Sequence, residues 1–308
     1  MQNPKIYDVI VIGGGPAGYT GAMYTARAGL KTLVIERVTV GGQMTQTTQI
    51  DNYPGFPQGI DGVTLGMEMQ AGAERFGVET VYAEVTRVTL ADKIKTVETE
   101  DTVYLGKTVL IATGADHKHL GVPGEEELVG RGVSYCAACD GMFYRDKTVV
   151  IVGGGNSAVA DALVLSRIAK EVILVHRRDT LRATKIYHDA LKKAPNVAFR
   201  WNSRVTKLHS DNVLTGVTVE DVHTGEQTEI SCQGMFVSIG RQPATGLFAQ
   251  QVELDALGYI VADESTLTSL PGVYAAGDVR TKALRQIVTA TADGATAAHS
   301  IEAYLAED

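Results

Sequence analysis

Two of the chain's three cysteines stand close together in the stretch SYCAACDGMF, where Cys136 and Cys139 are separated by two residues. A C-x-x-C pair can hold a metal ion, close a small structural loop, or cycle between dithiol and disulfide. A zinc site needs about four ligands, and His117 and His119 complement the pair poorly. A disulfide across so short a loop adds little stability through chain entropy. The choice among a metal site, a structural disulfide and a redox disulfide depends on which ligands the rest of the chain binds.

A glycine-rich turn near the N-terminus indicates a dinucleotide site. Residues 7–36 predict a strand, a turn, a helix and a second strand, and the turn contains Gly13, Gly15 and Gly18 as G-x-G-x-x-G. Such glycines allow a tight turn and bring a pyrophosphate to the helix N-terminus. Glu36 ends the second strand, where a carboxylate accepts hydrogen bonds from a free ribose 2′-hydroxyl. A glycine turn that merely packs is the weaker interpretation.

The same unit recurs later in the chain. Residues 147–178 again predict strand, turn, helix and strand, with Gly153, Gly155 and Ala158 as G-x-G-x-x-A. This duplication is the only internal repeat that the sequence shows. It predicts a second dinucleotide site.

The two sites differ in the residues after the second strand. His176 stands at the position of Glu36, at the same distance from its first glycine. Arg177, Arg178 and Arg182 follow it. Guanidinium groups bind a 2′-phosphate, which a carboxylate would repel. The second site is therefore expected to bind NADPH, and a merely solvated basic surface is the minority interpretation.

The first nucleotide is expected to be FAD. A chain with an NADPH site gains little from a second nicotinamide, whereas a flavin lets hydride chemistry reach another acceptor. The segments 109–114 (VLIATG) and 273–278 (VYAAGD) support this expectation. In flavoproteins with two dinucleotide sites, such segments contact the flavin nucleotide, and Asp278 is placed to bond the ribityl chain.

Beside two nucleotide sites, a disulfide that cycles is the favoured interpretation of the cysteine pair. Asp140 directly follows Cys139 and suits a proton donor to a thiolate, because disulfide reduction needs acid–base assistance. Asp140 could also cap the turn into a helix. Cys232 is expected to be a small buried residue in a strand, and no metal site is expected.

Composition narrows the class of protein. The length of 308 residues suggests about two domains, and a net charge of −8 argues against general nucleic-acid binding. No apolar stretch approaches the ~20 residues that span a bilayer. The first apolar run, residues 7–12, belongs to a predicted strand, so no signal or transit peptide is expected. With three cysteines and no disulfide framework, a reducing cytoplasmic location is expected.

Taken together, the motifs resemble those of the low-molecular-weight bacterial thioredoxin reductases over essentially the whole chain. They are GGGPAG, GGQM at 41–44, ATG, CAACDG, GGGNSA, HRR-xxx-R and AAGD…RQ. The resemblance implies a homodimeric FAD enzyme that moves electrons from NADPH to the flavin, to the disulfide of Cys136 and Cys139, and then to thioredoxin or a similar small dithiol protein. Cys139 would face the flavin, Cys136 would attack the partner, and Asp140 would act as the acid.

The expected fold is α/β with two Rossmann-like domains, the second inserted into the first. Residues 1–117 and 245–308 are expected to bind FAD, and residues 118–244 are expected to bind NADPH and carry the cysteines. The stretches near 114–118 and 243–246, where the chain crosses between them, contain Gly, Pro and Ala and are consistent with hinges.

The expected site residues follow from the motifs and the resemblance. For FAD they are Gly13, Gly14, Gly15, Pro16, Ala17, Gly18, Glu36, Gly42, Gln43, Asn52, Val85, Ala112, Thr113, Gly114, Asp278, Arg285, Gln286 and Ile287. For NADPH they are Gly153, Gly155, Asn156, Ser157, Ala158, His176, Arg177, Arg178 and Arg182. The partner is expected to dock near Arg131, Met142 and Phe143.

The chain departs from the pattern of these reductases at three positions. Ala138 stands where Thr is common, Met142 where an aromatic is frequent, and Ala244 where Asn is usual. The first bears on disulfide potential and the second on partner preference. One rival interpretation is a reductase of the same build with a non-thiol acceptor such as ferredoxin, which the intact cysteine pair disfavours. Another is a non-catalytic sensor that reports NADPH status through FAD and the dithiol.

Overall fold

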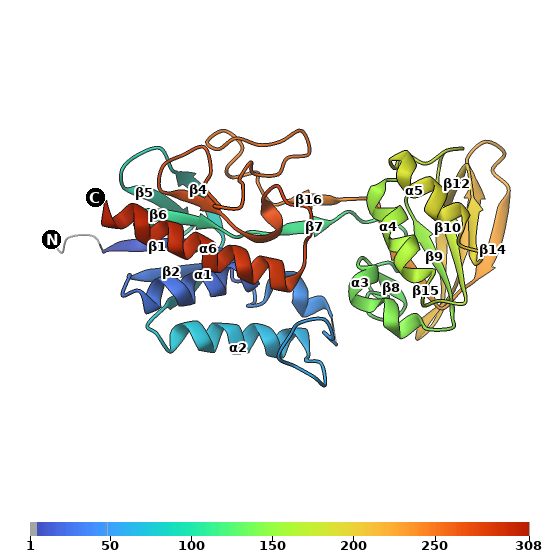
Figure 1. Cartoon of the computed structure of the whole chain (residues 1–308), viewed down its shortest axis with the longest axis horizontal. Coiled ribbons are helices and arrows are strands. Elements are labelled where there is room, and N and C mark those ends of the chain that lie inside the picture. The colour runs from blue at the N-terminus through green and yellow to red at the C-terminus, as the bar shows by residue number, and fades with distance from the viewer. Residues whose placement is uncertain (1–4, 48, 308) are drawn as a thin grey trace. The chain divides into compact units, whose positions relative to one another are not determined.

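The structure is a computed structural model that describes residues 5–47 and 49–307. It divides the chain into two compact units (Figure 1). Unit 1 comprises Met1–Asp116 and Gln242–Asp308, and unit 2 comprises His117–Arg241. Each unit contains a parallel sheet with helices, and the second unit is inserted into the first. The expected α/β fold with two Rossmann-like parts is confirmed.

Unit 1 is built on a seven-stranded sheet in the order β3-β2-β1-β6-β5-β4, with β17 paired to β6. The strands are β1 (Ile6–Ile12), β2 (Thr32–Glu36), β3 (Glu79–Tyr82), β4 (Val85–Thr89), β5 (Lys95–Thr99), β6 (Val103–Ile111) and β17 (Val273–Ala275). Strands β3, β2, β1, β6 and β17 are parallel, whereas β4 and β5 form an antiparallel extension. The central parallel strands are nearly continuous apolar runs because both of their faces are covered.

Small residues let the helices of unit 1 approach closely. Its helical segments are α1 (Pro16–Arg27), α2 (Gly62–Glu74), α6 (Ile287–Ala306), η1 (Gly42–Gln46) and η3 (Gly277–Val279). Helices α1 and α6 lie side by side although they come from opposite ends of the chain (Figure 1). A Cβ on Gly294 of α6 would lie 2.3 Å from the carbonyl oxygen of Ala17 in α1. A larger residue at this glycine would therefore push the two helices apart.

Unit 2 repeats the layout with a five-stranded parallel sheet in the order β11-β10-β9-β15-β8. Its strands are β8 (Val133–Ser134), β9 (Thr148–Val152), β10 (Glu171–Val175), β11 (Val197–Arg200) and β15 (Gly234–Val237). Its helices are α3 (Ala137–Asp140), η2 (Gly141–Tyr144), α4 (Asn156–Leu165) and α5 (Lys185–Lys192). An antiparallel sheet of β12 (Ser203–Asp211), β13 (Val213–Asp221) and β14 (Gln227–Ser231) completes the unit.

Two short strands pair where the chain passes between the units. They are β7 (Ala115–His117) and β16 (Arg241–Pro243). Among the described residues, no helix combines the length and the apolar character that crossing a bilayer requires.

Candidate functional site

The first glycine turn joins β1 to α1 and leaves the start of the helix open. Gly13 has φ +108°, and a Cβ there would lie 2.5 Å from the carbonyl oxygen of Ala112. A Cβ on Gly18 would lie 1.9 Å from the carbonyl oxygen of Gly13, so neither glycine can be replaced without movement. A Cβ on Gly15, by contrast, would meet no described atom within 4 Å. Since α1 begins at Pro16 without a side-chain cap, its first N–H groups can receive an anion.

Glu36 lies against the middle of this turn. Its Oε2 accepts a hydrogen bond from the N–H of Gly14 at 2.6 Å, and its Oε1 accepts one from the N–H of Val38 at 3.2 Å. The Gly14 carbonyl oxygen in turn accepts from the N–H of Gly41 at 2.8 Å. Backbone donors therefore fix a half-buried carboxylate at the end of β2.

Three other segments converge on the same turn. Ala112 of the ATG stretch lies against Gly13, as described above. A Cβ on Gly42 would lie 3.5 Å from the Cα of Gly15, and a Cβ on Gly277 would lie 2.9 Å from the Cβ of Ala17. The structure thus brings together, in unit 1, the first fingerprint and the GGQM, ATG and GD stretches that the sequence singles out.

The polar residues expected beside this turn bond mainly to one another and to nearby backbone. Gln43 donates to the carbonyl oxygen of Ala115 and, at 3.2 Å, to the carboxylate of Asp116. The Nδ2 of Asn52 donates to Oε1 of Gln286 at 3.0 Å. The other bonds are Thr113 Oγ1 to the Ala244 carbonyl at 2.8 Å and Arg285 Nε to the Asp278 carbonyl at 3.4 Å.

The remaining residues of the expected FAD set differ in exposure. Val85 starts β4, and its side chain is buried in the core of unit 1. Only its backbone is therefore available to a ligand. Gly114 has φ +73°, a left-handed conformation that favours glycine. Ile287 is the first residue of α6, after a capping box formed by Gln286 and Thr289.

The second glycine turn has the same construction. A Cβ on Gly153 would lie 2.4 Å from the carbonyl oxygen of Ser238 and 2.7 Å from the Cβ of Ala158. A Cβ on Gly155 would again meet no described atom within 4 Å. Helix α4 begins at Asn156 without a side-chain cap hydrogen bond. Ser157 follows on the first turn of the helix and is exposed.

His176 occupies in unit 2 the place that Glu36 has in unit 1. A Cβ on Gly154 would lie 2.3 Å from Cε1 of the His176 ring. The Gly154 carbonyl oxygen accepts from the N–H of Arg182 at 2.7 Å, as that of Gly14 does from Gly41. Burial, followed by the nearby arginines, lowers the pKa of His176. Its neighbours Arg177 and Arg178 are exposed, as is Arg182.

The cysteine pair forms a disulfide at the start of α3. The Sγ of Cys136 accepts a hydrogen bond from the N–H of Cys139 at 3.2 Å. Ser134 links the disulfide to the neighbouring acid: its Oγ accepts from the N–H of Cys136 at 3.1 Å and donates to Oδ2 of Asp140 at 2.7 Å. Burial raises the pKa of Asp140, and the bond from Ser134 opposes that rise. The site therefore places a carboxyl that holds its proton more tightly than usual close to the disulfide.

The capping role considered for Asp140 is not observed. Cys136 caps α3, and Asp140 lies at the cap position of η2 without a side-chain cap hydrogen bond. Sequence reasoning missed Ser134, whose only signal is its place at the end of β8, two residues before Cys136. Beyond the pair, Met142 and Phe143 are 53% and 43% exposed on η2, and Arg131 donates to the carbonyl oxygen of Glu127.

The other cysteine and the two histidines of the DHKH stretch are occupied elsewhere. Cys232 is fully buried, as predicted, although it follows β14 rather than lying within a strand. Burial raises the pKa of its thiol to about 12. His117 stacks on Tyr135, and Nδ1 of His119 lies 2.8 Å from the Tyr135 hydroxyl. Within the described residues, no group of three or more His, Cys, Asp and Glu side chains could hold a metal ion.

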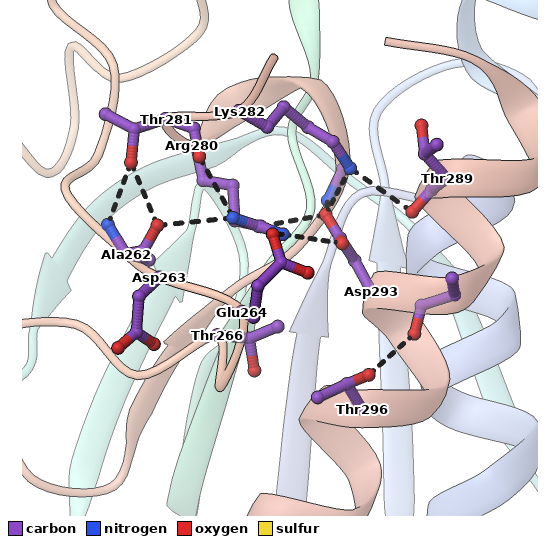
Figure 2. A network of polar contacts seen from close by, with 12 residues as sticks. Ala262, Asp263, Glu264, Thr266, Arg280, Thr281, Lys282, Thr289, Asp293 and Thr296 are labelled. Carbon is purple, nitrogen blue, oxygen red and sulfur yellow. Dashed lines mark hydrogen bonds and ion pairs between the residues drawn. The ribbon is translucent and has the colours of Figure 1, made fainter. Parts of the chain in front are cut away.

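A buried ion-pair network supports the GD turn and escaped sequence reasoning (Figure 2). The Arg280 side chain is 2% exposed and bonds Asp293 of α6 with two nitrogens, at 2.9 and 2.7 Å. Lys282 donates to the same carboxylate at 2.7 Å. The N–H of Gly277 also donates to it at 2.9 Å. Asp293 therefore ties the segment around Asp278 to α6, through residues distant in sequence that no short motif reveals.

Comparison with known proteins agrees with this geometry. Residues 7–294 match the pyridine nucleotide-disulphide oxidoreductase family. A thioredoxin reductase from Streptomyces clavuligerus is 49% identical over 98% of this chain and 94% of its own length. One from Bacillus subtilis is 46% identical over 100% of this chain and 97% of its own length. The crystal structure of thioredoxin reductase from Streptococcus pyogenes has a TM-score of 0.93 at 45% identity, covering 99% of this chain and 100% of that one. The chain belongs to the pyridine nucleotide-disulphide oxidoreductase family, among its thioredoxin reductases.

Proposed function

We propose that the chain is an NADPH-dependent thioredoxin-disulfide reductase with FAD as its prosthetic group. The observation that carries this proposal is the disulfide of Cys136 and Cys139, with a buried acid beside it. The same chain has two dinucleotide turns, of which one is followed by a carboxylate and the other by arginines. When bound, FAD accepts a hydride from NADPH and supplies two electrons to the disulfide. The chain's own residues bind the two nucleotides, hold the thiols and move the proton.

Unit 1 fits FAD. The uncapped start of α1 and the open space at Gly15 suit a pyrophosphate. Glu36 is held by backbone donors so that its half-buried carboxylate can accept from a ribose 2′-hydroxyl. Ala112, Gly42 and Gly277 lie against the same turn. In this proposal residues 1–117 and 245–308 form the FAD-binding domain, with Asp278, Arg285, Gln286, Asn52 and Gln43 toward the flavin.

Unit 2 fits NADPH. The uncapped start of α4 repeats the pyrophosphate site, and the carboxylate of the first unit is replaced by His176 and three exposed arginines. A 2′-phosphate at that point would receive charge-assisted hydrogen bonds from Arg177, Arg178 and Arg182. Residues 118–244 would then form the NADPH-binding domain that also carries the disulfide.

The thiol chemistry balances with the residues at hand. In the reduced enzyme, the Cys136 thiolate attacks the disulfide of the partner, forming a mixed disulfide and releasing one partner thiolate. The Cys139 thiolate then attacks the Cys136 sulfur, which restores the enzyme disulfide and releases the second partner thiolate. Asp140 donates a proton to a leaving thiolate, a role that its raised pKa supports.

The partner is thioredoxin or a similar small dithiol protein. Met142 and Phe143 offer an exposed apolar tip immediately after the disulfide, and Arg131 is exposed as well. Docking at this tip would place the partner's disulfide near Cys136. We further propose a homodimer located in the reducing cytoplasm, where NADPH and small dithiol proteins are available.

Replacing single cysteines tests the proposed electron path. Cys136→Ser and Cys139→Ser should each abolish thioredoxin reduction while FAD stays bound and remains reducible by NADPH. Cys232→Ala is the matched control, because this thiol is buried and takes no part in the disulfide, so its loss should not affect turnover. Thioredoxin turnover near the wild-type rate in either serine variant would show that electrons take another route.

A further inference from the structure

The chain's single tryptophan lies beside the residues expected to read the coenzyme phosphate. Trp201 follows β11 and is half-buried. Its indole stacks on Phe199, with ring centroids 4.8 Å apart and planes 5° apart. The rings of Trp201 and His176 form a T-shaped pair, with centroids 6.4 Å apart and planes 74° apart. The stacked pair of Phe199 and Trp201 therefore packs against His176, the first residue of the HRR stretch.

Backbone hydrogen bonds fasten the tryptophan segment to the same stretch. The N–H of His176 donates to the carbonyl oxygen of Arg200 at 2.9 Å, and the N–H of Ser203 donates back to the carbonyl of His176 at 3.0 Å. The N–H of Asn202 donates to the Arg178 carbonyl at 3.1 Å. Residues 200–203 therefore fix the path of the chain through 176–178.

The His176 ring transmits this support to the glycine turn. The ring is 5% exposed and lies so close to Gly154 that no side chain fits there. Its Nε2 is buried and has no hydrogen-bond partner among the described residues. A hydrogen bond with the backbone of Thr180 and packing between Trp201 and Gly154 together hold the ring in its orientation. The carbonyl oxygen of Gly154 holds the N–H of Arg182 at 2.7 Å.

The three arginines need such support. Arg177, Arg178 and Arg182 are exposed and form no ion pair within the described part of the chain. Like charges held close together repel one another, so their own side chains do not favour a converging arrangement. Backbone hydrogen bonds from residues 200–203 and from Gly154 hold their backbone, and the ring contact between Trp201 and His176 adds to this support.

We propose that Trp201 is a positioning residue that sets the preference for NADPH over NADH by holding His176 and the arginines in the phosphate-binding arrangement. The inference rests on the proposed function of unit 2 and deepens it. Trp201 contributes no charge and need not touch the phosphate. The backbone hydrogen bonds that close the glycine turn do not involve the indole, so its loss should act mainly on the 2′-phosphate contacts.

Coenzyme kinetics test the inference. Trp201→Ala should lower kcat/KM for NADPH by roughly tenfold, the equivalent of one charge-assisted hydrogen bond, mainly through KM. The value for NADH should change less than twofold, because NADH has no 2′-phosphate. Trp201→Phe keeps an aromatic edge and should retain most of the preference. Arg167→Ala, which changes an exposed residue elsewhere in unit 2, is the control and should resemble the wild type.

The tryptophan also reports binding directly. Titrating the holoenzyme with adenosine 2′,5′-bisphosphate should change the emission of Trp201, whereas 5′-AMP should not. Arg178→Ala should abolish that change. If Trp201→Ala does not fold, Trp201→Tyr and this titration remain decisive.

Equal losses for NADPH and NADH in the Trp201 variants, or an unchanged preference, would overturn the inference. A wild-type emission that ignores the bisphosphate would do the same. The proposed function has its own point of failure: a wild type that does not oxidise NADPH in the presence of thioredoxin.

Discussion

Asp140 is held in an environment that favours its protonated form. Burial raises its pKa, and the hydrogen bond from Ser134 offsets this effect only in part. The folded state therefore binds the proton more tightly than the unfolded state does, so the carboxyl's contribution to stability falls as the pH rises from 3.8 through the raised folded value. The raised pKa keeps the carboxyl protonated to a higher pH than an ordinary aspartic acid, which suits proton donation to a thiolate.

Replacing Asp140 with Asn should separate activity from stability. The amide keeps an acceptor for Ser134 but cannot deliver a proton, so thioredoxin reduction should fall by about two orders of magnitude, as loss of a general acid does. Since the amide does not ionise, the melting temperature of Asp140→Asn relative to wild type should rise with pH above 3.8 and then level off. Thermal melts at several pH values and turnover assays measure both effects. A variant with full activity would remove Asp140 from the mechanism.

The arginines after β10 should decide the choice of coenzyme. Arg177→Ala or Arg178→Ala removes a hydrogen bond to a charged phosphate, worth roughly 1.5–3 kcal/mol, and should weaken NADPH use by about ten- to a hundredfold. NADH use should barely change. Arg167→Ala, an exposed arginine elsewhere in unit 2, is the control. Measurements of kcat/KM with both coenzymes decide the matter, since equal losses would make the arginines structural.

At the residue scale, the sequence predicted the residues that belong to a recognisable motif. It did not predict residues whose role depends on contacts formed in the folded protein. The cysteines, Asp140 and the HRR stretch are adjacent in sequence to recognisable motifs. Ser134 joins Asp140 to Cys136 by hydrogen bonds that only the folded loop reveals. Trp201 meets His176 across two neighbouring strands, and no spacing rule predicts that contact.

At the scale of elements, the buried network between η3 and α6 supports the proposed flavin site. Burial acts to raise the pKa of Asp293, but the hydrogen bonds from Arg280 and Lys282 outweigh it and leave the pKa lowered. The contribution of this carboxylate to stability is therefore complete above its unfolded pKa of about 3.8 and is lost as the pH falls toward the folded value.

Asp293→Asn should expose this role. Removing one partner of a buried ion pair leaves uncompensated charge and costs about 3–5 kcal/mol, so the variant should unfold at lower denaturant and release FAD more readily. The difference from wild type should be largest at neutral pH and shrink as the pH falls below 3.8, because the carboxyl of the unfolded chain then binds a proton more readily than the ion-paired carboxylate of the folded chain. Thr296→Ala on the same helix is the control (Figure 2). Denaturant titrations at pH 7 and pH 3.5 measure the difference in free energy of unfolding between wild type and variant. Equal differences at the two pH values would contradict the account.

The two strand–turn–helix units were predictable because backbone atoms lie so close to some of their glycines that no side chain fits there. A Cβ on Gly18 would collide with the carbonyl oxygen of Gly13, and a Cβ on Gly153 would collide with that of Ser238. The Arg280–Asp293 pair was not predictable in the same way. Its members belong to a turn and a helix that meet only after the sheet has formed, and each residue alone reads as an ordinary surface charge.

At the scale of the whole molecule, the proposed electron path requires motion. The disulfide and the proposed NADPH site both belong to unit 2, and the proposal requires both to reach the flavin proposed for unit 1. We expect two arrangements of the units, related by rotation at 114–118 and 243–246. A short crosslink that joins unit 1 to unit 2 should block overall turnover but spare one half-reaction. Rapid-reaction absorbance of the flavin separates the half-reactions, and full activity in a verified crosslinked protein would exclude the rotation.

Turnover with thioredoxin tests the central claim most directly. A small amount of the protein is mixed with a large excess of NADPH and oxidised thioredoxin. The oxidation of NADPH is then followed together with the appearance of thioredoxin thiols. The account predicts many NADPH molecules oxidised per enzyme, two thiols formed for each, and no sustained oxidation when thioredoxin is left out. Stoichiometric bleaching of the flavin without turnover would contradict the account and identify a sensor of NADPH status instead.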